Sequence, residues 1–428
     1  YFSNFNIVKT MAYRQLSIES IAEYLQGIPE MKKVFSSFNE LDIREIGDGN
    51  LNYVYLVKNK EKPNESVALK QAVPFLRIVG ESWPLPKERM TIEIKALLKA
   101  SEWCPQNVPE IFFYSHEMSL VVMKDLSSHG VLRGQMIEGM YFPKLADHIS
   151  TYLAQNLFHT SDLFLDHREK KEMVREFINI DLCKITEDFV FTHPYEQNET
   201  NVYNPELKES DIKSIQEDSN LKISVAEMKR KFMTEAQALI HGDLHTGSIM
   251  ASEQETFVID PEFAFVGPMG FDLGAIIGNL LMSYFSHEYR QPLLGREPYQ
   301  YRKWLLETIE SLWSEFVNKF ENLWINHQNS SGDLYWDYDS GVEHFKNQRE
   351  KYILDLLQDS IGFAACKMMR RILGLAKVAD IADITDLKER ARIENITLQV
   401  GKKMVTERKK FQSISEVIDL AQEFSSLK

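Results

Sequence analysis

Residues 241–250 read HGDLHTGSIM, and residues 256–263, a few positions further along, read TFVIDPEF. Apolar residues precede the first segment and end it, so we expect a polar loop between two short strands, with Asp243 held on a turn rather than in solvent. A carboxylate placed in this way can orient and deprotonate a hydroxyl that attacks a phosphoryl group. Taken alone, the HGD triplet could also be a structural turn in which Asp243 binds backbone amides.

The second segment predicts a short strand that ends in two carboxylates. Residues i and i+2 of an extended chain lie on one face, so Asp260 and Glu262 could bind the same hard cation, as the magnesium of a nucleotide complex requires. Asp272 follows shortly afterwards and precedes an apolar helix. We expect a structural role for Asp272, either as the helix N-cap or as a partner of the loop at His241.

A glycine-containing loop lies upstream, between two predicted strands. Residues 46–54 read IGDGNLNYV, and glycine lets such a hairpin bring exposed backbone amides close to a ligand. An ordinary hairpin turn explains this segment equally well by itself. On the following strand Lys70 is placed to contact the phosphates of a nucleotide beneath the loop. A lysine that points inward needs an anion; Glu93 on the next helix is the candidate, with Glu88 as the alternative.

The hydrophobic pattern divides the chain into a small, mainly β part and a larger, mainly helical part. Strands are expected at 41–47, 52–58, 66–71, 110–115 and 119–123, with one main helix at 87–100. Beyond residue 128 long amphipathic helices follow, for example 302–325 and 360–379, with a capping box at Ser413 and Glu416 before the last helix and a polar surface excursion at 198–219. The prediction is an α+β, bilobal fold with an N-lobe at 11–125 and a C-lobe at 126–428.

Composition excludes several classes of function. The 428 residues carry a formal net charge of −14, which disfavours a general nucleic-acid or membrane-surface binder. Three widely separated cysteines without a CxxC pair argue against a disulfide scaffold or zinc site and favour a reducing compartment, the cytoplasm. The most apolar stretch, 274–285, is too short to cross a bilayer. Residues 1–10 lack the features of a signal peptide, and we expect the natural chain to start at Met11.

The order of these motifs resembles that of the protein-kinase-like phosphotransferases, and HGDLH resembles their small-molecule kinase branch, which includes aminoglycoside, choline and homoserine kinases. More closely, the chain resembles the 5-methylthioribose kinase family of methionine salvage. This resemblance rests on REIGDGNLNYV (44–54), KQAVP (70–74), VGESWPL (79–85), HGDLHTGSI (241–249), VIDPEFAF (258–265), GPMGFD (267–272) and RRILGLA (370–376). The blocks extend to Asp380 and so span nearly the whole chain.

The resemblance implies a kinase that uses ATP and magnesium to phosphorylate the 1-hydroxyl of 5-methylthioribose, acting as a homodimer. For the nucleotide, it implies contacts from Asn50 and Lys70, with Glu93 as the partner of the lysine, and adenine binding by the hinge residues Lys124, Asp125 and Leu126. For the sugar and the transferring phosphate, it implies roles for Asp243, Arg370, Arg371 and a covering loop at Trp83. Magnesium is assigned to Asp260 and Glu262.

Several positions keep more than one interpretation. Ser248 stands where the wider superfamily has an asparagine metal ligand, and Lys124 stands where relatives have an acidic hinge residue. Neighbouring residues of a helix diverge by about 100°, so Arg371 could enter a cleft while Arg370 could be solvated or face another subunit. Trp83 could simply pack against the first lobe, and Met368 and Met369 are expected in the core and at its rim.

Two other functions are weighed against this one. A kinase for another small alcohol, such as an aminoglycoside or choline, would need an acidic pocket for its cationic substrate, and Arg370 and Arg371 argue against such a pocket. A nucleotide-binding pseudokinase would normally have lost the strand lysine, the loop aspartate or the metal carboxylates. Lys70, Asp243 and Asp260 are all present.

Overall fold

The computed structural model describes residues 13–46, 51–76, 80–327 and 342–425. Its N-terminal part is built on an antiparallel sheet with the strand order β1-β2-β3-β7-β6. These strands are β1 (Leu41–Glu45), β2 (Asn52–Asn59), β3 (Ser66–Ala72), β6 (Ile111–Ser115) and β7 (Leu120–Lys124). The five predicted strands are therefore confirmed, each within two residues at its described ends.

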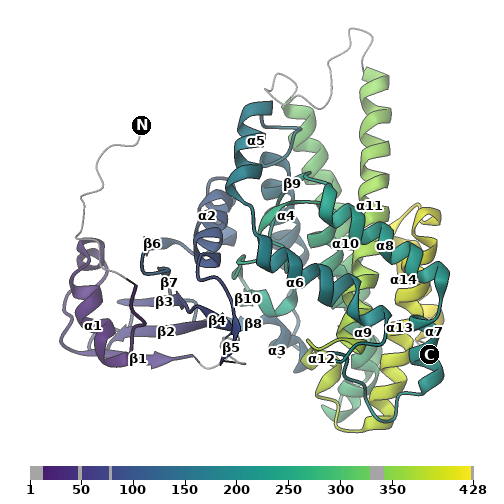
Figure 1. The fold of residues 1–428 in the computed structure, drawn as a ribbon, viewed down its shortest axis with the longest axis horizontal. Coiled ribbons are helices and arrows are strands. Elements are labelled where there is room, and N and C mark those ends of the chain that lie inside the picture. Colours follow the sequence, from purple (N-terminus) through teal and green to yellow (C-terminus); the bar gives the residue numbers. More distant parts are fainter. Residues whose placement is uncertain (1–12, 47–50, 77–79, 328–341, 426–428) are drawn as a thin grey trace.

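Alternation along β3 decides which side chains face the site. Val67 and Leu69 are fully buried and pack on the side of the sheet that helix α1 (Ile18–Gln26) covers. Ala72 packs on the opposite side, against helix α2 (Arg89–Ser101). Successive side chains of a strand point to opposite faces, so Lys70 shares the α2 side with Ala72. The sequence patterns did not predict α1, which lies at the outer end of the sheet in Figure 1.

The remaining N-terminal elements are a short hairpin, β4 (Phe75–Leu76) and β5 (Gly80–Pro84). The rest of the chain is mainly helical and lies beside the sheet in Figure 1. Small strands within it carry the loops of the site: β8 (Gly130–Val131), β9 (Ala238–Ile240), β10 (Ile249–Ala251), β11 (Thr256–Val258) and β12 (Phe265–Gly267). The overall architecture is the predicted α+β, bilobal, kinase-like fold.

The helices of the C-terminal part surround an apolar core that continues through most of its length. They are α3 (Leu132–Ile137), α4 (Leu145–His159), α5 (His167–Glu176), α6 (Ile180–Phe191), α7 (Glu209–Gln216), α8 (Ser219–Thr234), α9 (Gly270–Leu293), α10 (Pro298–Asn326), α11 (Val342–Leu373), α12 (Ala379–Ala382), α13 (Leu387–Glu407) and α14 (Ile414–Phe424). No described helix combines the length and apolar character that a membrane crossing requires.

Three helical predictions have definite outcomes. The capping box at Ser413 and Glu416 is present at the start of α14. The helix predicted to run to residue 379 ends at Leu373, and Leu375 is 49% exposed rather than part of the apolar stripe; Gly374 follows the last helical residue, as is common at helix ends. The predicted surface excursion at 198–219 is exposed or half-buried over most of its length, and it contains the helix α7, which buries Ile215 and Gln216.

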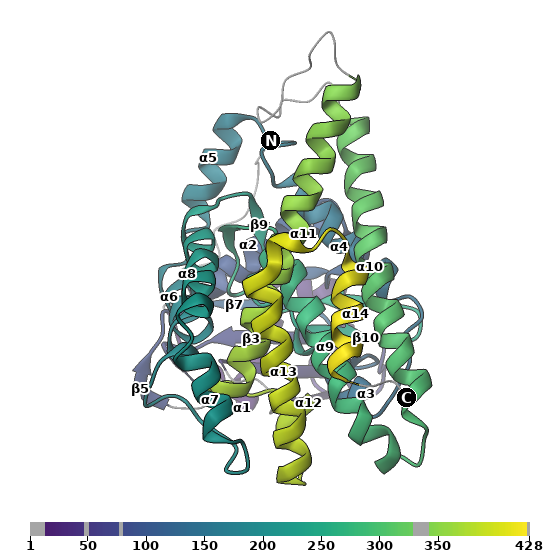
Figure 2. The same cartoon turned by 90° about the vertical axis from the view of Figure 1, so that its right-hand side faces the viewer.

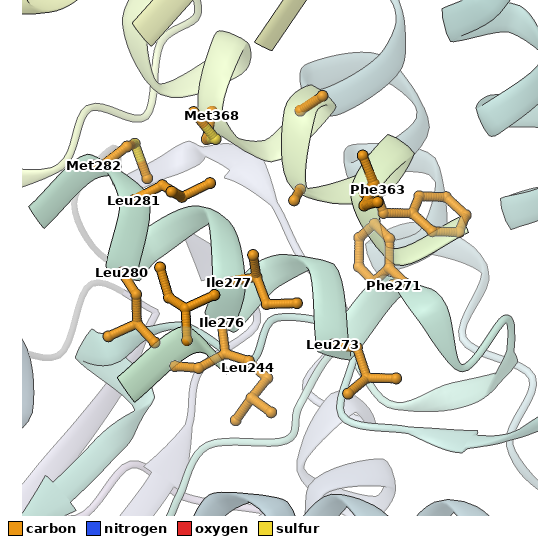
Figure 3. Close-up of a cluster of buried hydrophobic side chains, with 14 of the residues drawn as sticks. Leu244, Phe271, Leu273, Ile276, Ile277, Leu280, Leu281, Met282, Phe363 and Met368 are labelled. Atoms are coloured by element: carbon orange, nitrogen blue, oxygen red, sulfur yellow. The ribbon is translucent and has the colours of Figure 1, made fainter. Parts of the chain in front are cut away.

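Glycines bring α9 and α11 close together in the core that Figure 3 shows. A Cβ atom on Gly274 would lie 2.4 Å from the carbonyl oxygen of Ser360 and 2.6 Å from the amide nitrogen of Ala364. Both atoms belong to the backbone of α11, which cannot move aside cheaply. Gly274 therefore sets the separation of these helices, and α11 carries residues of the site.

We expect Gly274→Val to lower the free energy of unfolding by roughly 3 kcal/mol, because the added methyl groups overlap a helix backbone. Denaturant unfolding measures this change. Gly134→Ala on α3 is the matched control, since an added Cβ there meets nothing within 4 Å; it should leave stability equal or raise it by up to about 1 kcal/mol. Equal stability of both variants would contradict the close packing of α9 on α11.

Candidate active site

The loop after β9 is held by a buried carboxylate. Asp272 accepts hydrogen bonds from the amides of His241, at 2.6 Å, and Gly242, at 3.0 Å. Gly242 has a φ of 81°, and a Cβ atom there would lie 2.2 Å from the carbonyl oxygen of Phe263, so this position requires glycine. Asp272 is thus the partner of the loop and not the N-cap, a position that Met269 occupies. The result is a rigid turn that presents Asp243.

Cations surround Asp243. The amine of Lys367 lies 2.6 Å from its Oδ1 atom, and guanidinium nitrogens of Arg370 and Arg371 lie 3.8 and 4.0 Å from the same atom. Burial raises the pKa of Asp243, but Lys367, His245 and Arg371 more than reverse this effect and hold the pKa well below its usual value. Asp243 is therefore a carboxylate at neutral pH, and its side chain remains 22% exposed.

Both arginines point toward Asp243. Each is at least nine-tenths buried, so the expectation that Arg370 could be solvated is wrong. That expectation treated one apolar stripe as the only buried face of the helix, but α11 packs between α9 and α13 and is enclosed on several sides (Figure 2). Lys367, Arg370 and Arg371 have the spacing i, i+3 and i+4, which places them together on one face. Met368 and Met369 are fully buried core residues.

The strand lysine and the helix glutamate meet. The amine of Lys70 donates to Glu93 at 2.7 Å and also contacts Asp260. Glu88 instead pairs with Lys87 in solvent, so the alternative partner is excluded. Burial lowers the pKa of Lys70, but the carboxylates of Asp260 and Glu93 outweigh that effect and raise it above its usual value. The amine is therefore charged and lies between the two parts of the fold.

Glu262 is deeply buried, and one of its two carboxylate oxygens is already hydrogen-bonded within the protein. Its side chain is 1% exposed, and its Oε2 atom accepts hydrogen bonds from Asn52 at 3.0 Å and from Arg89 at 3.2 Å. Arg89 also donates to Asn52 at 2.7 Å, which closes a three-residue network. A metal would accordingly be bound through the other carboxylate oxygen of Glu262.

The carboxylates present fit a hard cation. Among the described residues, Glu93, Asp260 and Glu262 each place one oxygen within 4.8 Å of the others. Asp260 is 44% exposed, and the Oε2 atom of Glu93 is buried without a hydrogen-bond partner in the described part of the chain. Burial, followed by the charge of Asp260, raises the pKa of Glu262. Such oxygens are the ligands that magnesium prefers.

The structure describes the predicted hinge residues at the end of β7. Lys124 ends β7, with its amine 4.6 Å from the ring centroid of Phe257. Asp125 is bound by Lys58 at 3.2 Å, and Leu126 is buried. The side chains of the hinge thus have structural partners, which is compatible with adenine binding through backbone groups. Asn50 and the glycine loop lie outside the described residues.

Ser248 and Trp83 have defined positions. The hydroxyl of Ser248 binds carbonyl oxygens of its own loop, those of Asp243 at 3.0 Å and His245 at 2.8 Å, so this serine stabilises the turn. Trp83 on β5 lies with its ring centroid 6.2 Å from that of Phe189 on α6. The indole therefore contacts the helical part, whereas the sequence left open that it packs on the first lobe.

Sequence reasoning missed three residues of the site: Lys367, Arg89 and Asn52. Lys367 had a usable signal, because it precedes the arginine pair at helical spacing. Arg89 and Asn52 had none, since their partner Glu262 is 173 and 210 residues away in the chain.

Comparisons with known proteins give one consistent answer. Residues 182–307 match the model of the phosphotransferase enzyme family (APH). Methylthioribose kinase 1 of Oryza sativa subsp. japonica is 40% identical over 417 residues, which is 96% of each chain. The methylthioribose kinases of a Geobacillus species and of Bacillus cereus are 40% and 43% identical, over 90% and 84% of this chain and 91% and 86% of theirs. The chain belongs to the methylthioribose kinase family and is an ATP-dependent kinase.

Proposed function

We propose that this kinase transfers the γ-phosphoryl group of ATP to the 1-hydroxyl group of 5-methylthioribose in methionine salvage. The products are 5-methylthioribose 1-phosphate and ADP. The observation that carries the proposal is a partly exposed carboxylate, Asp243, beside the buried cations Arg370 and Arg371. A hydroxyl acceptor needs such a carboxylate, and a transferring phosphoryl group needs such cations. Relatives that cover almost the whole chain are methylthioribose kinases.

In the reaction, the sugar oxygen forms a bond to the γ-phosphorus while the bond from that phosphorus to the bridging oxygen of ADP breaks. Asp243 orients the hydroxyl and receives its proton. The low pKa of Asp243 makes it a weak base, which suits a loose transition state in which the proton leaves late. Lys70 binds the nucleotide phosphates, and Arg370 and Arg371 stabilise the charge on the transferring group.

Magnesium fits the carboxylate cluster between the two parts of the fold. Two carboxylates would hold it. Asp260 would use its partly exposed carboxylate, and Glu262 would use the oxygen to which Arg89 and Asn52 do not donate. When bound, magnesium neutralises and orients the phosphates of the nucleotide.

From the family resemblance we also propose where the adenine and the sugar bind, the oligomeric state and the compartment. The adenine is bound by the backbone of the hinge at Lys124, Asp125 and Leu126, with Asn50 near the phosphates, and the lobes meet at residues 125 and 126. The hairpin with Trp83 covers the sugar. The protein is a homodimer in the cytoplasm. Burial raises the pKa of all three cysteine thiols to about 12, which fits unreactive thiols in a reducing compartment.

A coupled ADP-release assay with 5-methylthioribose, ribose, choline and kanamycin tests the proposal. We expect the highest kcat/KM for 5-methylthioribose. Choline and kanamycin should be poor substrates because Lys367, Arg370 and Arg371 repel a cation near the acceptor position. A preference for choline or kanamycin would contradict the sugar assignment, and absence of substrate-dependent ADP with all four would contradict kinase activity on these acceptors.

A further inference from the structure

Lys367 is a buried lysine whose amine is directed at the catalytic carboxylate. Its side chain is 4% exposed, and its Nζ atom donates to Oδ1 of Asp243 at 2.6 Å. On the other side, the amine lies 4.4 Å from the ring centroid of Phe271, which is fully buried. A buried ammonium group is costly unless it is paired. The packing of α11 on α9 therefore holds this charge in one place.

The arginines do not make the same contact. Their nearest nitrogens lie 3.8 and 4.0 Å from Oδ1 of Asp243, which is beyond hydrogen-bond distance. Arg371 donates instead to the carbonyl oxygen of Ala376 at 3.1 Å. Within the described part of the chain, Lys367 is thus the cation that fixes Oδ1 of Asp243.

The other carboxylate oxygen of Asp243 faces a weaker partner. Oδ2 lies 3.3 Å from Nε2 of His245. Burial lowers the pKa of His245 to about 4, so its imidazole is neutral at pH 7. A neutral partner at this distance competes poorly with a substrate hydroxyl, whereas the short bond to Lys367 holds Oδ1.

We propose that Lys367 is a positioning residue for the phosphoryl transfer: it fixes Asp243 through Oδ1 and so leaves Oδ2 to receive the sugar hydroxyl. The inference rests on the proposed function. Lys367 is not required to touch the sugar or the nucleotide. It acts through the orientation and the ionisation of Asp243.

The charges that face Lys367 come from three elements. Asp243 faces it from the loop after β9, Asp272 from α9, and Arg370 and Arg371 from its own helix, while His245 lies at the other oxygen of Asp243. Burial lowers the pKa of Lys367 to about 8, and the two arginines act in the same direction, while Asp243 opposes them. The amine is mainly protonated at pH 7. Its removal takes away the largest attraction that keeps the pKa of Asp243 low.

The test compares Lys367→Met with Lys367→Arg and the wild type over pH 5 to 9. In the methionine variant we expect kcat to fall about 100-fold at pH 7.5, with the KM for ATP changed less than threefold. The wild-type pKa of Asp243 lies below this pH range and rises when its positive partner is lost, so an acidic limb of kcat/KM should enter the range in the methionine variant and be absent from the wild type. Lys367→Arg keeps the charge without the compact amine; it should keep the wild-type pH profile and recover at least tenfold over methionine.

Lys170→Met is the matched control. Lys170 is also a buried lysine, with its amine bonded to the carbonyl oxygens of Gln237 and Thr160 and paired with Asp162 at 3.1 Å. Loss of stability without a change of the pH profile is expected for this control. A dependence of kcat/KM on acidic pH in Lys367→Met that equals that of the wild type would overturn the inference, as would full activity in that variant. If Lys367→Met does not fold, Lys367→Gln takes its place, and wild-type kcat with a wild-type pH profile in Lys367→Gln would then overturn the inference.

The outcomes separate the two proposals. If the wild type does not phosphorylate 5-methylthioribose, the proposed function fails, whatever the variants do. If the wild type is active and the neutral variants share its kcat and pH profile, the role of Lys367 fails and the function stands.

Discussion

Replacement of Asp243 by asparagine is expected to reduce kcat by about 10³-fold or more while the affinity for ATP changes little. Asparagine keeps the shape of the side chain but cannot accept the proton of the sugar hydroxyl. The Lys70 region, where we place the phosphates of ATP, has separate partners in Glu93 and Asp260. Steady-state kinetics measure kcat, and calorimetric titration with ATP measures binding.

Asp147→Asn is the control for this variant. Asp147 is an exposed carboxylate on α4 that pairs with Lys319 at 2.6 Å, and its replacement should leave kcat within twofold. Near-normal turnover by Asp243→Asn would mean that this aspartate is not the residue that engages the hydroxyl. Equal loss of ATP binding and turnover would show instead that the variant disturbs the whole site.

Replacement of Lys70 by methionine is the second large effect. It removes a cation that lies among Glu93, Asp260 and Glu262, and breaking a buried pair of this kind costs about 3–5 kcal/mol of stability. Turnover should fall at least 100-fold, because the nucleotide phosphates lose their positive partner.

Magnesium adds a discriminating measurement to this variant. The carboxylates that remain repel one another, so Mg²⁺ alone should raise the Tm of Lys70→Met more than it raises that of the wild type. Differential scanning calorimetry at several Mg²⁺ concentrations measures both shifts. Lys184→Met is the control, because Lys184 belongs to an exposed pair with Asp188 on α6. A larger magnesium effect on the wild type would contradict the carboxylate cluster as the cation site.

The sequence predicts the position of a residue when the direction of its side chain follows from the secondary structure of the adjoining segment. Strand alternation was enough to bring Lys70 to the face of the sheet that α2 covers, and hence to Glu93. The apolar residues on both sides of HGD predict two short strands, and this was enough to predict that Asp243 lies on a turn between them. The same local reasoning correctly gave Asp272 a structural role, although it could not choose between two structural partners.

Other features depend on packing that no local pattern records. The sequence did not determine whether Arg370 is buried. Because α11 is enclosed on several sides, a single apolar stripe does not tell which of its residues are exposed. Glu262 was expected to face a metal, and its salt bridge to Arg89 comes from a distant part of the chain. The end of α11 was predicted too late because Leu375 continues the apolar period beyond Gly374.

The contact between Trp83 and Phe189 gives the enzyme a built-in optical probe. The indole belongs to β5 in the N-terminal part, and the phenyl ring belongs to α6 in the helical part. Indole emission depends on the polarity around the ring, so the fluorescence of Trp83 responds to the separation of these two elements. The chain has six tryptophans, so a variant that keeps Trp83 as its single tryptophan would let the separation of β5 and α6 be followed without attaching a label.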